Sequence, residues 1–268
     1  MEHNQIKKIT SQYYQKLRKY VSRIPDDFDI STIHEFRVEY KKLRAFFRML
    51  SQQPQIKHEI SVSKKLKTVY ALSGSLRDLQ LQQVRVSDST RKEPKQPQAY
   101  LHLLQKKIEI LKTQLTEAIA EKPVNESKRK TDAHSPERFK SSGFSLFVQN
   151  RRDAIKEIII SGDFSDQNIH VIRKMLKDLF YIGKISEGAG EKNQSEITAD
   201  FSNVNKLLDE LGDFQDRCTS IALLKSYWII NLNTYNQQLL NRLKKTWIRQ
   251  KVSLKQMLIR KIKTELLS

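Results

Sequence analysis

Two segments of this chain, 136 positions apart, repeat the pattern IHxxRxxxKxL. The pattern occurs in "IHEFRVEYKKLRAFFRML" at 33–50 and in "IHVIRKMLKDLFYIGKI" at 169–185. A second pair keeps the same order, since "LSGSLRD" at 72–78 and "ELGDFQD" at 210–216 each place an aspartate four residues after a glycine. Two matches in one order indicate an internal duplication, so we expect each half to form one structural unit.

The first repeated segment is amphipathic when it is wound as an α-helix. Its basic side chains and one histidine fall within an arc of about 80° that runs along about 21 Å of helix. This stripe consists of His34, Arg37, Lys41, Arg44 and Arg48. Large apolar residues from Phe36 to Leu50 occupy a separate sector, which has the width of an ordinary core-facing side. One face is therefore expected to pack while another presents cations without acidic partners at the next helical turn.

The composition favours a helical protein with an anionic partner. The chain has 268 residues, is 38% hydrophobic and contains only 7 glycines and 6 prolines, which suits one or two domains with real cores. A net charge of +19 and a pI near 9.9 point to nucleic acid, an acidic membrane surface or a phosphate polymer.

Cysteine content and hydropathy predict a cytoplasmic protein. The single cysteine, Cys218, excludes an internal disulfide framework and fits a reducing compartment. The beginning "MEHNQIKK" lacks the apolar region of a secretory signal, and no segment approaches the length of about eighteen apolar residues that a membrane span requires. We therefore expect no membrane span.

Apolar spacing of three and four residues predicts eight helices and no strands. The first is stopped by Pro25, and the second starts at the N-cap Asp29 and ends before Pro54. The fifth begins at 135–137, where Pro136 would occupy its first turn. The other expected ranges are 4–24 for the first helix, 56–86, 98–121, 165–186, 197–231 and 234–266, with loops at 87–98 and 186–196.

The polar segment 121–136 lacks periodicity and is predicted to connect the two halves. Eight helices in two sets of four predict an all-α fold of two antiparallel four-helix bundles related by a pseudo-twofold axis. In this prediction a single domain covers 1–268, with halves at 1–122 and 136–268 and a linker at 123–135. The two stripes would face each other across a groove.

The repeated motifs resemble those of the CHAD domain, the conserved histidine α-helical domain. The segment "HEFRVEYKKLR" at 34–44 is similar to the HxxRxxxRRLR-type motif of that family, and the two Gly-Asp segments resemble its LGxxRD-like segments. The stretch "LKKTW" at 243–247 resembles the family's terminal helix, which is aromatic and basic. The resemblance covers nearly the whole chain.

The resemblance implies an all-helical protein that binds inorganic polyphosphate in a basic central groove, without a catalytic role, a cofactor or a metal. Polyphosphate, including that of granules, or another polyanion would be the partner. Asp178 and Phe180 stand where the family tends to have basic residues, and Lys174 and Lys184 could compensate for them. The binding residues expected by position are His34, Arg37, Lys41, Lys42, Arg44, Arg48, Arg77, His170, Arg173, Lys174, Lys177 and Lys184.

These residue types suit a phosphate chain, because Arg offers a planar fork to two oxygens and Lys a compact charge. Protonated histidines would tighten binding below about pH 6.5, their unperturbed pKa. We expect Gly74 and Gly212 to serve packing, and Asp78 and Asp216 to orient a neighbouring Arg or His or to cap structure. Residues 241–263 carry nine Lys or Arg and no acid, and are expected to line the groove only in part.

Nucleic-acid binding is the alternative, because +19 attracts any phosphate backbone. Against it, the stripe lacks interleaved aromatic residues for base stacking, and no helix-turn-helix or zinc-finger signature is present. An enzyme is less favoured, since the sequence has no Gly-rich nucleotide loop, no paired-carboxylate metal signature and no Ser/His/Asp arrangement.

Overall fold

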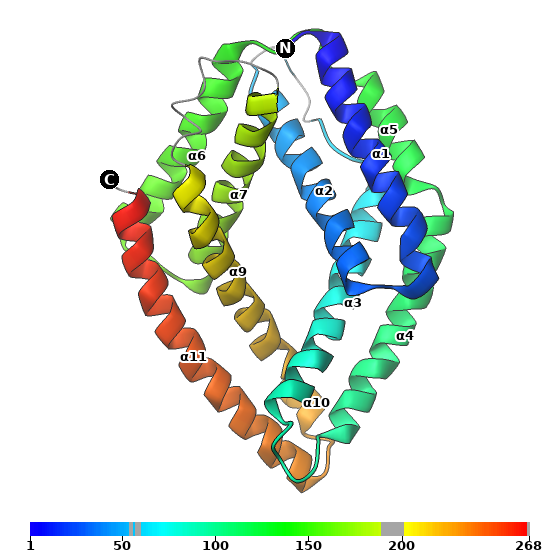
Figure 1. Ribbon diagram of the computed structural model, residues 1–268, viewed down its shortest axis with the longest axis vertical. Coiled ribbons are helices and arrows are strands. Elements are labelled where there is room, and N and C mark those ends of the chain that lie inside the picture. The colour runs from blue at the N-terminus through cyan, green and yellow to red at the C-terminus, as the bar shows by residue number, and fades with distance from the viewer. Residues whose placement is uncertain (54–55, 57–59, 189–200, 267–268) are drawn as a thin grey trace.

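The structure is a computed structural model that describes residues 1–53, 56, 60–188 and 201–266 (Figure 1). Within these ranges the chain is helical, which confirms the expected all-α class. The one β pairing among the described residues is an isolated bridge between Glu2 and Arg138. In the same ranges, no helix has the length and apolarity that crossing a bilayer requires.

The long helices follow the predicted ranges closely for the second, fourth, sixth and eighth segments. The helices are α1 (His3–Asp27), α2 (Ile30–Leu50), α3 (Lys64–Ser89), α4 (Gln98–Ala120), α5 (Pro123–Ala133), α6 (Ser141–Ser161), α7 (Asp166–Gly188), α9 (Phe201–Leu223), α10 (Ser226–Ile229) and α11 (Thr234–Leu266). The predicted N-cap of α2 is confirmed, because the Asp29 carboxylate accepts a hydrogen bond from the Thr32 backbone N–H at 2.8 Å.

The helices form two walls (Figure 1). The first wall has α2 and α3 on its inner side, with α1, α4 and α5 packed outside them. The second wall has α7 and α9 on its inner side, with α6 and α11 outside. The walls meet at two places, where α2 packs on α7 and where α3 packs on α9. The two copies of the repeated motif, on α2 and α7, are therefore neighbours in space.

The apolar face of α2 lies in the core, as its periodicity predicted. Phe36, Tyr40, Leu43, Phe46, Phe47 and Leu50 are all buried. Phe46 contacts the ring of Tyr13 on α1, at a centroid distance of 6.5 Å. Because this face is fixed against the outer helices, the basic stripe of α2 must point away from the core of its wall.

Pro25 does not end the first helix, contrary to the prediction. The helix α1 continues through Pro25 to Asp27. Proline lacks an N–H, so in a last turn it removes a single intrahelical hydrogen bond. Phe28 then adopts a left-handed conformation with φ 53°, and its N–H bonds to the Ile24 carbonyl at 2.9 Å. This cap at Phe28, three residues after Pro25, ends the helix.

Two other helices start later than predicted. The stretch before α3 contains buried Ile60 and Val62, whose spacing of two residues is not helical. The helix starts only after Ser63, whose Oγ accepts the Leu66 N–H at 3.2 Å. The helix predicted to start at 135–137 starts instead at Ser141, as α6. The Phe139 backbone exchanges hydrogen bonds of 2.8 Å with Met1, which holds this stretch extended.

The predicted helix at 197–231 is divided. The helix α9 ends at Leu223, and the short α10 begins at Ser226. Its predicted start at 197–200 lies outside the described residues. The helix α7 extends to Gly188, so the predicted loop at 186–196 begins later, and the remainder of that loop also lies outside the described residues.

The segment predicted as a linker contains a docked helix. Pro123 occupies the first turn of α5, where its missing N–H has no cost. The buried residues of α5 are Pro123, Val124, Ser127 and Thr131, so its apolar contacts are confined to the first turn and form no stripe for a periodicity analysis to detect. The Ser127 Oγ lies 2.8 Å from the Tyr14 hydroxyl and accepts the Ser63 N–H at 3.1 Å, which ties α5 to α1 and to the start of α3.

Ser127→Ala should therefore destabilise the fold. The substitution leaves the Tyr14 hydroxyl and the Ser63 N–H buried with one partner fewer, which costs about 1–3 kcal/mol. Urea unfolding monitored by circular dichroism measures the loss. Arg129→Ala, at an exposed position of the same helix, is the control and should change the free energy of unfolding by less than about 0.5 kcal/mol. Equal effects of the two variants would contradict the docking role of Ser127.

Candidate functional site

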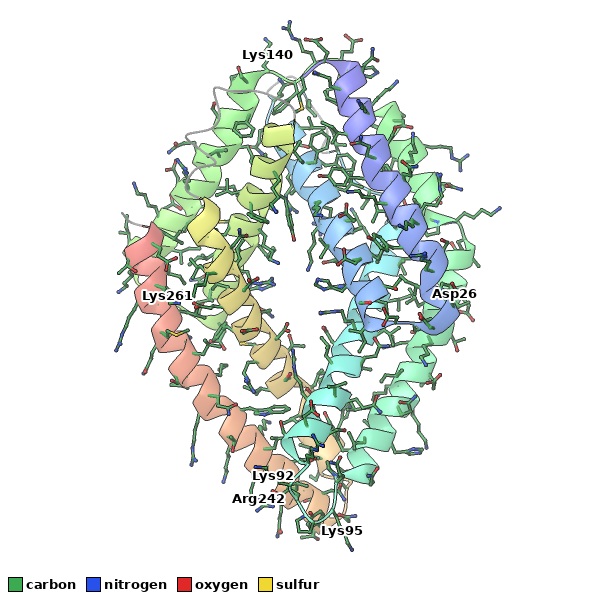
Figure 2. All side chains as sticks on the ribbon, in the orientation of Figure 1. Asp26, Lys92, Lys95, Lys140, Arg242 and Lys261 are labelled. Carbon is green, nitrogen blue, oxygen red and sulfur yellow. The ribbon has the colours of Figure 1, made fainter. Side chains whose placement is uncertain are left out.

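Five of the predicted residues form one group where α2 meets α7. Lys41 on α2 lies within electrostatic range of Arg37, of Arg77 on α3, and of Arg173 and Lys177 on α7. We call Arg37, Lys41, Arg77, Arg173 and Lys177 the central cluster. In Figure 2, side chains with nitrogen tips extend from the inner helices of both walls toward the space between the walls. The stripes of the two motif copies therefore converge, as expected.

Among the residues that the structure describes, no counter-charge is in direct contact with the central cluster. None of its five residues forms a salt bridge within 4 Å in the part of the chain that the structure describes. All five side chains are half-buried, so water compensates their charges only in part. Like charges brought together in this way repel one another and favour the binding of an anion.

The two lysines of the cluster lose much of their basicity. Burial, and then the charges of Arg37 and Arg173, lower the pKa of Lys41 to about 7. Burial, and then Arg173, lower the pKa of Lys177 to about 8. Both pKa values lie below those of an unfolded chain, so the unfolded state binds more protons between pH 7 and about 10. Folding stability supplied by these groups therefore rises with pH across that window.

The two histidines flank the cluster. Partial desolvation and the charge of Arg77 lower the pKa of His34. Burial and the charge of Lys174 lower the pKa of His170, while a hydrogen bond with Gln215 acts in the opposite direction. Gln215 occupies the position in the second motif copy that Arg77 occupies in the first. His170 therefore interacts with Gln215 as His34 interacts with Arg77. Without a bound anion, both histidines are mainly neutral at pH 7, and the lysines become the groups that titrate there.

Each of the two repeated glycines lies next to the arginine of its own motif copy. A Cβ atom at Gly74 would lie 2.3 Å from the Arg37 guanidinium, which also donates to the Tyr70 carbonyl and stacks over the Tyr70 ring at 4.2 Å. A Cβ atom at Gly212 would lie 3.6 Å from the Arg173 guanidinium, an ordinary contact. The packing role expected for the glycines fits Gly74, although the neighbour is a side chain rather than a helix backbone, whereas Gly212 has room for a Cβ atom.

Three predicted residues of α2 lie outside the cluster or are already paired. Lys42 donates to the buried carboxylate of Glu39 at 2.6 Å. Arg48 forms an ion pair with Asp178 of α7, and its charge is therefore compensated. Arg44 is exposed, with its guanidinium 5.9 Å from the Tyr40 ring centroid. Lys42 and Arg48 thus already have acidic partners, and their role as ligand contacts stays a prediction.

Two predicted residues of α7 are exposed. Lys174 lies close enough to His170 to lower its pKa. Lys184 lies over the Phe180 ring, with 4.4 Å between its Nζ and the ring centroid. Neither residue is among those that affect the pKa of Lys41. They are positioned at the edge of the cluster rather than inside it.

Two arginines that the sequence reasoning did not place at the site form ion pairs with aspartates of the second wall. Arg85 of α3 donates to the Asp216 carboxylate and to the Ser220 hydroxyl of α9, both at 2.7 Å. Arg151 of α6 lies 3.5 Å from Asp178, which also pairs with Arg48. The spacing of seven residues between Asp78 and Arg85 places both on one face of α3, and this was the available signal.

The carboxylates near the site have structural partners. Asp216 accepts from Arg85, in line with the orienting role expected for it. Burial raises the pKa of Asp78, while the nearby charges of Arg37 and Arg77 act to lower it. Among the described residues, no group of three or more His, Cys, Asp or Glu side chains is placed to hold a metal ion.

The two glycines should respond differently to alanine. Alanine at a helical glycine gains about 1 kcal/mol from helix propensity, so Gly212→Ala should stabilise the protein slightly. Gly74→Ala must expel the Arg37 guanidinium from the Tyr70 carbonyl, and should be less stable than Gly212→Ala by about 2 kcal/mol. Thermal and urea unfolding of the two alanine variants provide the measurement. Equal stabilities would show that the Arg37 guanidinium does not pack against Gly74.

Comparison with known proteins gives a family and a fold. No match is found among curated proteins. A crystal structure of the CHAD domain from the plant Ricinus communis is similar, with a TM-score of 0.70 and 12% sequence identity, and the alignment covers 100% of this chain and 92% of that chain. A family model described as the CHAD domain matches residues 8–225. The chain, whose two motif copies meet in a single basic cluster, therefore belongs to the CHAD domain family.

Proposed function

We propose that this protein binds inorganic polyphosphate, without turnover, at the central cluster. The observation that carries the proposal is the group of five half-buried cations, drawn from α2, α3 and α7, that have no salt-bridge partner among the described residues. Such a group raises the local positive potential and selects anions. A flexible chain of phosphates presents one charge per unit and can reach both walls.

The residue types support a phosphate ligand. Arg37 is held by its hydrogen bond to the Tyr70 carbonyl and by stacking over the Tyr70 ring, so its planar fork is partly ordered before a ligand arrives. Arg173 offers the same fork from the second wall. Lys41 and Lys177 add compact charges that phosphate oxygens would restore to full protonation. His34 and His170 lie next to the cluster and can donate a hydrogen bond as neutral rings.

The proposal includes the origin of the site. The halves 1–122 and 136–268 are proposed to be two copies of one four-helix unit, related by a pseudo-twofold axis. In this proposal, the duplication gave each wall one basic stripe, on α2 and on α7. Because α2 packs on α7, the two stripes form a single site. We further propose that the ligand is cytoplasmic polyphosphate, including that of granules.

Replacing Arg37 and Arg173 should weaken polyphosphate binding. In the double variant Arg37→Gln and Arg173→Gln, each wall loses one charge-assisted contact, and we expect the Kd to rise by at least about tenfold. The salt dependence of the affinity should also become shallower. Titration of a defined polyphosphate at several salt concentrations measures both effects.

The matched control is Lys7→Gln with Lys8→Gln, which removes the same charge from an exposed part of α1 and should leave the Kd within about twofold. Circular dichroism checks that each variant is folded. Equal weakening of both double variants would mean that net charge, and not the central cluster, attracts the ligand. Preference for duplex DNA over polyphosphate in a competition assay would favour the nucleic-acid alternative, and release of orthophosphate would contradict binding without turnover.

Polyphosphate binding should take up protons near neutral pH. Before binding, Lys41 and Lys177 titrate at about 7 and about 8, and phosphate oxygens raise both pKa values. The affinity should therefore fall as the pH rises above 7, by up to about tenfold per pH unit for each proton taken up. Calorimetry at pH 8 in buffers with different ionisation enthalpies counts the protons.

Lys41→Arg is the test variant for this linkage, because arginine stays charged throughout the range. It should lose about one proton of uptake at pH 8. Lys42→Arg, which replaces the lysine paired with Glu39, should keep the wild-type value. A Lys41→Arg protein with unchanged proton uptake would exclude Lys41 as the titrating group.

A further inference from the structure

Lys41 differs from its neighbour Lys42 in the charges that surround its amine. Lys42 donates to Glu39 at 2.6 Å, so its charge is stabilised. Lys41 makes no hydrogen bond or ion pair among the described residues. It is half-buried and surrounded by cations from three helices. Adjacent positions of α2 therefore hold one lysine with an acidic partner, Lys42, and one without such a partner among the described residues, Lys41.

We propose that Lys41 is a site of covalent acylation by small acyl phosphates. The central cluster supplies two requirements at one position, namely an amine that is held partly uncharged and a positive surrounding that concentrates an anionic reagent. Acylation at Lys41 would remove a charge from the middle of the cluster and weaken polyanion binding. This last consequence rests on the proposed function, whereas the reactivity does not.

Cations from three helices surround Lys41 and favour its neutral amine. Arg37 lies on its own helix, Arg77 on α3, and Arg173 and Lys177 on α7, and all carry positive charge. His34 and His170 border the cluster. Asp78, Asp209 and Asp216 act on Arg77, Arg173 or Lys177 and supply the opposing negative charge. At pH 7 about half of Lys41 is neutral, against about one part in 2,500 of a lysine with the ordinary pKa.

The chemical step is balanced without any further reagent. The lone pair of the Lys41 Nζ attacks the carbonyl carbon of the acyl phosphate and forms an amide bond. The bond between that carbon and the phosphate oxygen breaks, so orthophosphate leaves with the electron pair. The amine loses one proton to solvent, and no oxidant or reductant is involved.

Acetyl phosphate is the probe for this reaction. The full-length protein is treated at pH 7, and peptide mass spectrometry measures the acetylation rate of each lysine. We expect Lys41 to react at least about tenfold faster than Lys42, because the larger neutral fraction exceeds the loss of nucleophilicity that accompanies a low pKa. Lys177 should rank second. A Lys41 rate equal to that of Lys42 would overturn the proposal.

A neutral reagent separates amine reactivity from anion attraction. With N-hydroxysuccinimidyl acetate the preference for Lys41 should persist but be smaller than with acetyl phosphate, and 1 M NaCl should reduce only the acetyl phosphate preference. Arg173→Gln removes one attracting charge and should slow acetylation of Lys41 by acetyl phosphate severalfold. If both reagents gave equal preference, anion attraction by the cluster would be refuted.

Lys41→Gln reproduces the loss of charge and Lys41→Arg preserves it. The Gln variant and the acetylated protein should both bind polyphosphate more weakly than the Arg variant, by about tenfold at pH 6.5. Circular dichroism of the two variants confirms folding. Selective acetylation in a protein that does not bind polyphosphate would refute the proposed function and keep this inference, while binding without selective acetylation would do the reverse.

Discussion

Repulsion between like charges, where the two walls meet, is the constraint on which the rest of this structure depends. The cluster around Lys41 places charges from α2, α3 and α7 together without salt-bridge partners among the described residues. Such an arrangement opposes folding, and it persists because other contacts at the same junctions offset it. Two ion-pair groups do so, one between Arg48 and Asp178 and the other between Arg85 and Asp216.

The cross-wall pairs follow a consistent division of charge. In each case the arginine comes from the first wall and the aspartate from the second. Breaking a buried ion pair by removing one partner is far more costly than breaking an exposed one, and Asp178 is only 7% exposed. The basic residues therefore divide into those that pair across the walls and those of the central cluster, which have no salt-bridge partner among the described residues.

Much of the fold and part of the site could be predicted from the sequence, because the information was local. Helical periodicity identified α2 and its buried face, and the repeat identified Arg37 and Arg173 as equivalent positions. Prediction failed where a distant segment decided the conformation. The helix α5 has a polar inward face that is satisfied by Tyr14, and the backbone near Phe139 is extended because it pairs with Met1.

The sequence by itself determined which residues share a helix face, since the period of the helix fixes that relation for any helical segment. It could not determine which cations of one stripe stay unpaired. Lys41 and Lys42 are adjacent in the chain, yet Glu39 pairs with only one of them, and Arg48 is compensated by an aspartate 130 positions away. The pair of Lys42 with Glu39 lies within α2, whereas only the packing of α2 on α7 decided that Arg48 is paired and that Lys41 lies among cations. Coulomb energy depends on distance and burial in space rather than on separation along the chain.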